Sequence, residues 1–199
     1  MTNSFADYLN TDLFFVIGSN PTEAHPMAGA KIMSSLLNGT KLIVADPRRI
    51  ELAEKADIWL QHRPGTDIPL LNGLMHIIIK EDLHDKKFVE ERTEGFEELK
   101  ATVENYTPER VSEMTGVPVN LLYDAARLYA TTYKAMLCYT LGITEHICGV
   151  DNVMSTANIA MLTGHLGREG CGVNPQRGQN NVQGACDMGA LPGDFPGYQ

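Results

Sequence analysis

Glycine, polar and charged residues follow the short apolar runs of this sequence. They lie at points where a chain of alternating strands and helices would turn. The residues in these turns are Gly18, Asn20, Asp46, Arg48, Gly65, Asp67, Gly142 and Thr144. Glycine lets backbone N–H groups approach a pyrophosphate closely, and the N-terminus of a following helix favours its negative charge. Asp46 suits ribose hydroxyls, Asp67 could accept two hydrogen bonds from the N1 and N2 edge of guanine, and Arg48 could pair with phosphate. Together these residue types predict a nucleotide site.

Ordinary turn chemistry is the competing interpretation of the same residues. The first turn lacks the G-x-G-x-x-G pattern of the common NAD site. Gly18 and Gly65 can serve only to turn the chain, and an aspartate before proline, as at Asp46, often opens a turn. The six histidines lie singly, and the four cysteines form no close pair of the kind that holds zinc or an iron–sulfur cluster. Free thiols are therefore expected, and no residue of the chain is predicted to bind a metal.

The apolar runs predict buried strands with helices between them. We expect strands over about 13–17, 41–45, 57–61 and 136–140. Helical spacing of apolar residues predicts a connecting helix between the first two strands, and a shorter helix precedes the third. Since this order favours parallel pairing with right-handed crossovers, the polar turns should meet at the carboxyl ends of the strands, where such sheets bind their ligands.

The middle third of the chain is predicted to be a series of amphipathic helices placed between the third and fourth strands. The predicted fold class is therefore α/β: a Rossmann-like parallel sheet with helices on both faces and a helical insertion. A single domain over residues 1–199 is expected, since the sequence shows no linker and no repeat. The formal net charge of −9 disfavours nucleic acid, and no apolar segment is long enough to cross a bilayer. Neither nucleic-acid binding nor direct membrane insertion is expected.

The stretch NPQRGQNNVQGACDMG, residues 174–189, differs from the rest of the chain because it is polar and rich in glycine. Periodicity stops after Gly167, so residues 168–199 are expected to be irregular. A structureless tail of roughly 30 residues argues against a self-contained compact domain. We expect these residues to be mobile in the chain by itself.

Several strings taken together resemble the molybdopterin oxidoreductases. They are GSNPTEAHP, VADPRR, RPGTD, the run from Ala160 to Gly189 and PGYQ, in one order from about Asn3 to Gln199. The most specific string, RGQNNVQGACDMG, is similar to that of the catalytic subunits of molybdenum- or tungsten-dependent formate dehydrogenases. The resemblance implies oxidation of formate to carbon dioxide with bis(molybdopterin guanine dinucleotide), and a [4Fe–4S] cluster in an N-terminal domain that this sequence lacks. It also implies that the chain is a fragment and inactive by itself.

The same resemblance assigns residues to a site. Arg177 corresponds to the family's active-site arginine, and its planar, permanently charged guanidinium matches the two oxygens of formate. Gly178 and Gln179 follow in the loop that the family lays along the pterin, here as part of an irregular cofactor loop and tail over 168–199. The turn residues named above would line one guanine dinucleotide. The implied partners are formate, other domains of the same subunit and electron-transfer subunits. A cytoplasmic location is expected, with any export signal upstream of Met1.

Three alternatives stay open at this point. Another molybdopterin enzyme, such as a nitrate reductase, would use an oxyanion as oxidant, and the long RGQNNVQGACDMG string speaks against it. The large iron–sulfur subunit of respiratory NADH dehydrogenase carries a similar domain as a scaffold without the cofactor. Arg177, Asp46 and Asp67 argue against that alternative, because a scaffold needs none of them. A soluble NAD-binding domain is disfavoured by the missing glycine fingerprint.

Overall fold

A five-stranded parallel sheet forms the centre of the molecule. The computed structural model describes all 199 residues. The strands are β1 (Leu13–Ile17), β2 (Lys41–Ala45), β3 (Ile58–Leu60), β4 (Ala135–Tyr139) and β5 (Gly172–Pro175), and they lie in the order β3-β2-β1-β4-β5. Every neighbouring pair is parallel. The four predicted strands are confirmed to within one residue at each end, and their parallel arrangement is confirmed.

The pairing register brings the carboxyl ends of the inner strands together. Ile17, the last residue of β1, lies between Ala45 of β2 and Tyr139 of β4, which are also the last residues of their strands. The chain continues from β1 to β2 and β3 on one side and then returns to β4 and β5 on the other. The strand order therefore reverses beside β1, and this reversal is where open parallel sheets bind their ligands.

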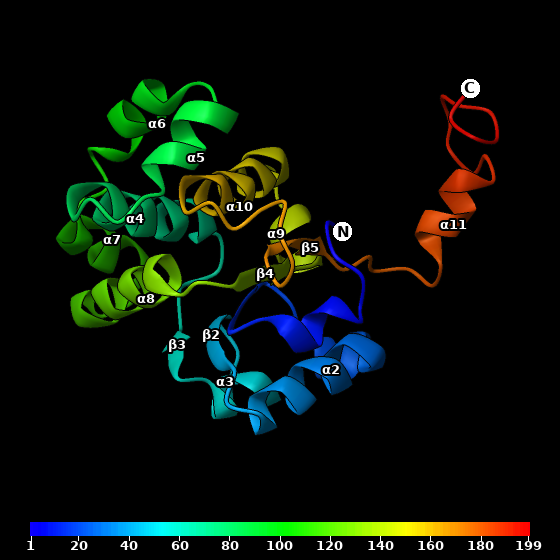
Figure 1. Cartoon of the computed structure of the whole chain (residues 1–199), viewed down its shortest axis with the longest axis horizontal. Helices are drawn as coiled ribbons and strands as arrows, with labels where there is room; N and C mark the ends of the chain where they lie inside the picture. The colour runs from blue at the N-terminus through cyan, green and yellow to red at the C-terminus, as the bar shows by residue number, and fades with distance from the viewer.

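Helices cover both faces of the sheet, as predicted (Figure 1). One face carries α2 (Pro26–Leu37) and α3 (Glu51–Lys55), and the other carries α4 (Asp67–Lys80), α8 (Val119–Thr131) and α10 (Gly149–Leu162). Alternate side chains of β1 enter the two layers: Phe14 and Val16 pack with α2 and α3, whereas Phe15 packs with the other layer. The whole of β1 is buried, which explains why its sequence is apolar at every position.

The helical insertion between β3 and β4 runs from α4 to α8. Its other members are α5 (Lys86–Arg92), α6 (Phe96–Val103) and α7 (Pro108–Thr115). Thr107 begins α7 by accepting a hydrogen bond from the Arg110 N–H (3.4 Å), and Pro108 takes the first helical position. Gly116 ends the same helix with a φ of 80°. None of the helices in the structure has both the length and the apolar character needed to cross a membrane.

The prediction of irregular structure throughout residues 168–199 is wrong for two parts of that segment, a strand over 172–175 and a helix over 182–187. Gly172–Pro175 forms β5, which pairs with β4, and Asn174 is fully buried. Residues near the N-terminus cover the outer side of β5. The Thr2 N–H donates to the Val173 carbonyl (3.2 Å), and Asn3 Nδ2 donates to the Cys171 carbonyl (3.0 Å). This strand has only four residues, and its glycine and proline are not typical of a strand, so the sequence does not predict it. Tertiary contacts hold it in place.

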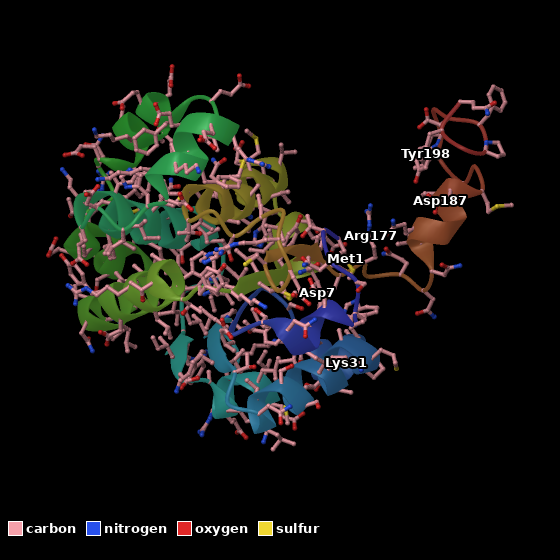
Figure 2. All side chains as sticks on the ribbon, viewed as in Figure 1. Met1, Asp7, Lys31, Arg177, Asp187 and Tyr198 are labelled. Atoms are coloured by element: carbon pink, nitrogen blue, oxygen red, sulfur yellow. The ribbon has the colours of Figure 1, made fainter.

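The rest of this segment projects from the body of the molecule (Figure 1). After Arg177 the chain leads to α11 (Val182–Asp187), which has no buried side chain. Figure 2 shows Asp187 and Tyr198 on the projecting part, where the Tyr198 hydroxyl donates to the Asp187 carboxylate (2.5 Å). The mobility of this projection in the chain by itself stays a prediction.

Gly142, in the short helix α9 (Leu141–Thr144), packs against Gly18 at the end of β1. A methyl group on Gly142 would lie 2.5 Å from the Gly18 carbonyl oxygen and 2.7 Å from its Cα. Because the obstacle is backbone, no side-chain rotation relieves the clash. We expect Gly142→Ala to lower the free energy of unfolding by about 1–3 kcal/mol, measured by urea denaturation. In the control variant Gly193→Ala the added methyl meets no atom within 4 Å, so its stability should be unchanged. Equal stability of the two variants would contradict the prediction.

Candidate functional site

One cavity at the carboxyl ends of the strands gathers nearly all of the predicted nucleotide residues. Its volume is about 390 Å³, and its lining includes Gly18, Asn20, Asp46, Arg48, Gly65, Asp67 and Gly142. These residues come from the turns after β1, β2, β3 and β4, which the register places side by side. We refer to this space as the turn cavity.

Thr144 is the exception among the predicted turn residues. It lines a second cavity of about 330 Å³, together with Arg177, Gly178 and Gln179. Thr140 and Leu141 line both cavities, so the two adjoin at the end of β4. The structure therefore places the predicted nucleotide residues next to the predicted pterin and substrate residues.

Asp46 ends β2 at the turn cavity and is 5% exposed. Its Oδ1 accepts a hydrogen bond from the Arg48 N–H (2.8 Å), while Trp59 Nε1 donates to its carbonyl oxygen (3.0 Å). Burial raises the pKa of this carboxyl, although the Arg48 N–H and guanidinium act in the opposite direction. The Arg48 side chain is largely exposed, with Nε 3.8 Å from Asp46 Oδ1. Its guanidinium is therefore open to a phosphate at the mouth of the cavity.

Two histidines that the sequence pattern did not single out surround the Asp67 carboxylate. Asp67 begins α4 and is buried, and His62 Nε2 lies 3.0 Å from its Oδ1. His146 Nε2 lies 3.9 Å from its Oδ2. Because a carboxylate only accepts hydrogen bonds, His62 donates in this pair and fixes the orientation of Asp67. The position of His62, in the turn between β3 and Asp67, is a signal that could have revealed it.

Gln176 anchors the backbone directly before Arg177 and is a second residue that sequence reasoning missed. Its side chain is 4% exposed. Ser19 Oγ donates to its Oε1 (3.3 Å), its Nε2 donates to the Tyr8 hydroxyl (3.4 Å), and its backbone N–H donates to the Tyr139 carbonyl (2.8 Å). Arg177 itself is exposed, at the base of the projecting segment (Figure 2). The sheet therefore fixes the chain up to Gln176 and leaves the Arg177 side chain outside it.

The four cysteines are free, as predicted. Cys138, on β4, is fully buried, and burial raises the pKa of its thiol to about 12. A thiol with such a pKa stays protonated near neutral pH and is a poor nucleophile. Cys171, beside β5, is also buried, and burial raises its pKa as well.

The donors and acceptors of the turn cavity suit one nucleotide. The buried carboxylates of Asp46 and Asp67 can accept hydrogen bonds from ribose hydroxyls or base N–H groups, and Arg48 supplies a positive charge. Gly65, with a φ of 79°, leaves open space, since a Cβ there would meet no atom within 4 Å. The volume falls within the range of small-molecule sites. The residues present therefore fit a nucleotide chemically.

We expect Asp46→Asn to raise the stability of the chain near neutral pH. Because burial raises the pKa of Asp46 in the folded state, the folded chain holds this proton more tightly than the unfolded chain. The free energy of unfolding therefore falls as pH rises from about 3.8 through the raised pKa. Asparagine keeps an oxygen for the Arg48 N–H and carries no charge, so the Tm at pH 7 should be higher than that of the parent, and the difference should shrink as pH falls.

Asp57→Asn provides a control, because its expected effect on the Tm is opposite to that of Asp46→Asn. Burial also acts to raise the pKa of Asp57, but hydrogen bonds from Lys41 Nζ (2.8 Å) and the Leu42 N–H (2.9 Å) outweigh it and lower that pKa. Replacing the Asp57 carboxylate by the neutral amide of asparagine should therefore lower the Tm at pH 7. A parental or lower Tm for Asp46→Asn would show that burial does not destabilise the Asp46 carboxylate.

Comparison with known proteins identifies the family. A family model described as molybdopterin oxidoreductase matches residues 1–199. The chain belongs to the molybdopterin oxidoreductase family. Membership, together with the names of its relatives, implies a molybdopterin cofactor with molybdenum or tungsten.

Relatives of this molybdopterin oxidoreductase chain are named as formate dehydrogenases. It is 51% identical over 199 residues to F420-dependent formate dehydrogenase 1 subunit alpha of Methanococcus maripaludis. It is 50% identical over the same length to the F420-dependent formate dehydrogenase subunit alpha of Methanocaldococcus jannaschii and to formate dehydrogenase H of Escherichia coli. In each case the whole chain is covered, but only 28–30% of the relative. The chain thus spans less than a third of the length of these relatives.

A solved structure supports the Rossmann-like fold of this molybdopterin oxidoreductase. Acetylene hydratase from Pelobacter acetylenicus superposes with a TM-score of 0.78 at 34% identity, over 84% of this chain and 23% of the other. Its name is that of a hydratase, so the shared fold does not by itself determine the reaction.

Proposed function

We propose that the chain is the central dinucleotide-binding part of the catalytic subunit of a formate dehydrogenase, which oxidises formate to carbon dioxide. The observation that carries this proposal is the identity of 50–51%, over the whole chain, to proteins named as formate dehydrogenases. The adjoining cavities support it, because they bring the proposed nucleotide residues and Arg177 to one end of the sheet.

The turn cavity would bind one guanine dinucleotide of bis(molybdopterin guanine dinucleotide). Asp67, oriented by His62, would accept hydrogen bonds from N1 and N2 of guanine. Asp46 would accept from ribose hydroxyls, and Arg48 would pair with phosphate. Gly18, Asn20, Gly65 and Gly142 would form the surrounding turns, and Thr144, Gly178 and Gln179 would follow the cofactor into the second cavity.

Arg177 would bind formate and offset its negative charge. A guanidinium offers two parallel N–H donors to the two oxygens of a carboxylate, which fixes the direction of the single C–H bond of formate. Oxidation of formate to carbon dioxide releases one proton and two electrons. The cofactor, when bound, supplies the two-electron redox chemistry, and the chain supplies binding, orientation and charge.

The remaining parts of the proposal concern the rest of the protein. Electrons would pass to a [4Fe–4S] cluster in another domain and then to electron-transfer subunits, and the chain by itself would be inactive. We also propose a cytoplasmic location. The anionic surface of the chain, with its net charge of −9, agrees with partners other than nucleic acid.

Purification of the full-length subunit tests the proposal. It should contain molybdenum or tungsten, release GMP from its cofactor on hydrolysis, and reduce a viologen dye when formate is added. A pterin cofactor without GMP would contradict the assignment of the turn cavity. A loaded subunit that reduces nitrate but does not oxidise formate would favour the nitrate reductase alternative, and a protein without cofactor would favour the scaffold alternative.

A further inference from the structure

His25 connects the first helices of the fold to the loop that carries Arg177. It lies between α1 (Pro21–Ala24) and α2, where it ends the first helix and precedes the second. Its ring Nε2 is 2.5 Å from the carbonyl oxygen of Arg177. Since a carbonyl oxygen only accepts hydrogen bonds, Nε2 carries the hydrogen of this contact. The ring therefore binds the backbone of Arg177 and not its side chain.

This contact is the polar interaction that orients the His25 ring. The other ring nitrogen, Nδ1, is buried and has no hydrogen-bond partner. No hydrogen bond therefore holds the ring on the Nδ1 side, and the bond to the Arg177 carbonyl is the one that fixes its orientation. The helix break at His25 is itself rigid, because Pro21 and Pro26 begin the two helices and a Cβ on Gly29 would meet the Pro21 carbonyl at 2.8 Å.

The backbone around Arg177 is held from two directions. On one side Gln176 is bound to Tyr139 through its N–H and buried through its side chain. On the other side His25 holds the Arg177 carbonyl. The Arg177 side chain is exposed, so the direction in which it leaves the chain depends on the backbone between these two contacts.

We propose that His25 is a positioning residue for Arg177. By holding the Arg177 carbonyl, it fixes the peptide plane that follows the arginine and thereby the direction of the guanidinium. The inference rests on the proposed function, in which Arg177 binds formate. Two parallel hydrogen bonds to a carboxylate require a defined direction, and a small rotation of the backbone weakens one of them.

Hydrogen exchange in the full-length subunit tests the contact without reference to activity. In His25→Ala the amides of residues 177–181 should exchange about two- to tenfold faster than in the parent, because one backbone restraint is lost. His25→Gln keeps a side-chain N–H donor and should restore slow exchange. The control is His76→Ala: His76 Nδ1 also bonds a backbone carbonyl, that of Val103 (2.9 Å), but in the helical insertion. This control should leave exchange at 177–181 unchanged.

A double-mutant cycle tests whether His25 acts through Arg177. In the loaded enzyme His25→Ala should lower kcat/KM for formate about two- to tenfold, chiefly through KM, with parental metal and pterin content. In an Arg177→Lys background, His25→Ala should lower kcat/KM little further. The guanidinium with two parallel N–H donors, which His25 orients, is already absent there. His25→Gln should recover the parental KM.

The outcomes separate this inference from the function on which it rests. Unchanged formate kinetics in Arg177→Lys would remove the arginine from the proposed function. Parental kinetics in His25→Ala beside impaired Arg177→Lys would overturn only the role of His25, and so would additive losses in the double variant. Parental exchange at 177–181 in His25→Ala would overturn it whatever the kinetics.

Discussion

Arg177→Lys in the full-length subunit is expected to lower kcat/KM for formate about ten- to a hundredfold. Lysine keeps the positive charge, but two parallel hydrogen bonds become one point contact. A charge-assisted hydrogen bond contributes about 1.5–3 kcal/mol, and each 1.36 kcal/mol corresponds to about a tenfold change in rate. Arg177→Ala removes the charge as well, so it should lower kcat/KM for formate more than Arg177→Lys does.

Metal and pterin content, measured beside formate kinetics, shows which step is affected. Both variants should retain cofactor, since the proposed guanine and phosphate contacts lie in other turns. Arg127→Lys is a matched control, because Arg127 forms a two-bond pair with Glu81 (2.6 and 2.8 Å) on the helical insertion. It should leave formate kinetics unchanged. Near-normal kinetics in Arg177→Ala would exclude Arg177 from the active site, and joint loss of activity and pterin would make it a cofactor anchor.

The stability of the chain should decrease by about 3 kcal/mol between pH 6.5 and pH 4 because of one buried histidine, His165. Its Nε2 is 2.9 Å from the Thr132 carbonyl oxygen, and its Nδ1 is 2.8 Å from Thr163 Oγ1. Since the carbonyl only accepts, Nε2 donates and Nδ1 accepts from the threonine hydroxyl. Burial lowers the pKa of this ring from 6.5 to about 4. The Thr132 carbonyl acts in the opposite direction, and nearby Arg168 reinforces the lowering.

The sign of the effect follows from proton binding in the two states. Above about pH 6.5 the ring is neutral in both folded and unfolded chains, so its contribution to stability is fully present. Between about 6.5 and 4 the unfolded chain binds a proton that the folded chain does not, and the free energy of unfolding falls by about 1.4 kcal/mol for each pH unit.

Urea denaturation at several pH values measures this slope. His165→Gln keeps a donor for the Thr132 carbonyl but cannot become protonated, so its stability should vary less over this pH range, although it is lower at pH 7. Carboxylates titrate in both proteins, so the difference between the two curves isolates the histidine. Parallel curves for the parent and His165→Gln would rule out this explanation.

The strands that the sequence predicted correctly are those whose local pattern agrees with their place in the fold. The run Leu13–Ile17 is apolar at every position, and a strand at the centre of the sheet with helices on both faces requires this. The run Gly172–Pro175 forms a strand for a different reason: β4 and the N-terminal residues supply its hydrogen bonds. A four-residue run with glycine and proline carries no such information locally.

The residues of the candidate site also divide into those that the sequence could predict and those that it could not. The turns after parallel strands must meet at one end of a sheet, so the sequence could predict that Gly18, Asp46 and Asp67 lie near one another. The position of His62 in the turn before Asp67 gave a signal for it, but no local pattern could predict Gln176 or His25, because their contacts depend on three-dimensional packing. Thr144 lines the neighbouring cavity because α9 carries it past the turn cavity. That any of these residues binds cofactor or formate stays a prediction.

The contacts of Thr2 and Asn3 with β5 also bear on how copies of the chain behave at high concentration. A sheet that is not closed into a barrel offers free N–H and C=O groups on its outermost strands, and these can template the addition of strands from other molecules. Here one outermost strand is already occupied by the first residues of the chain, and the other, β3, is only three residues long. Neither side presents a long backbone template, so the edges of the sheet resist the addition of strands from other molecules.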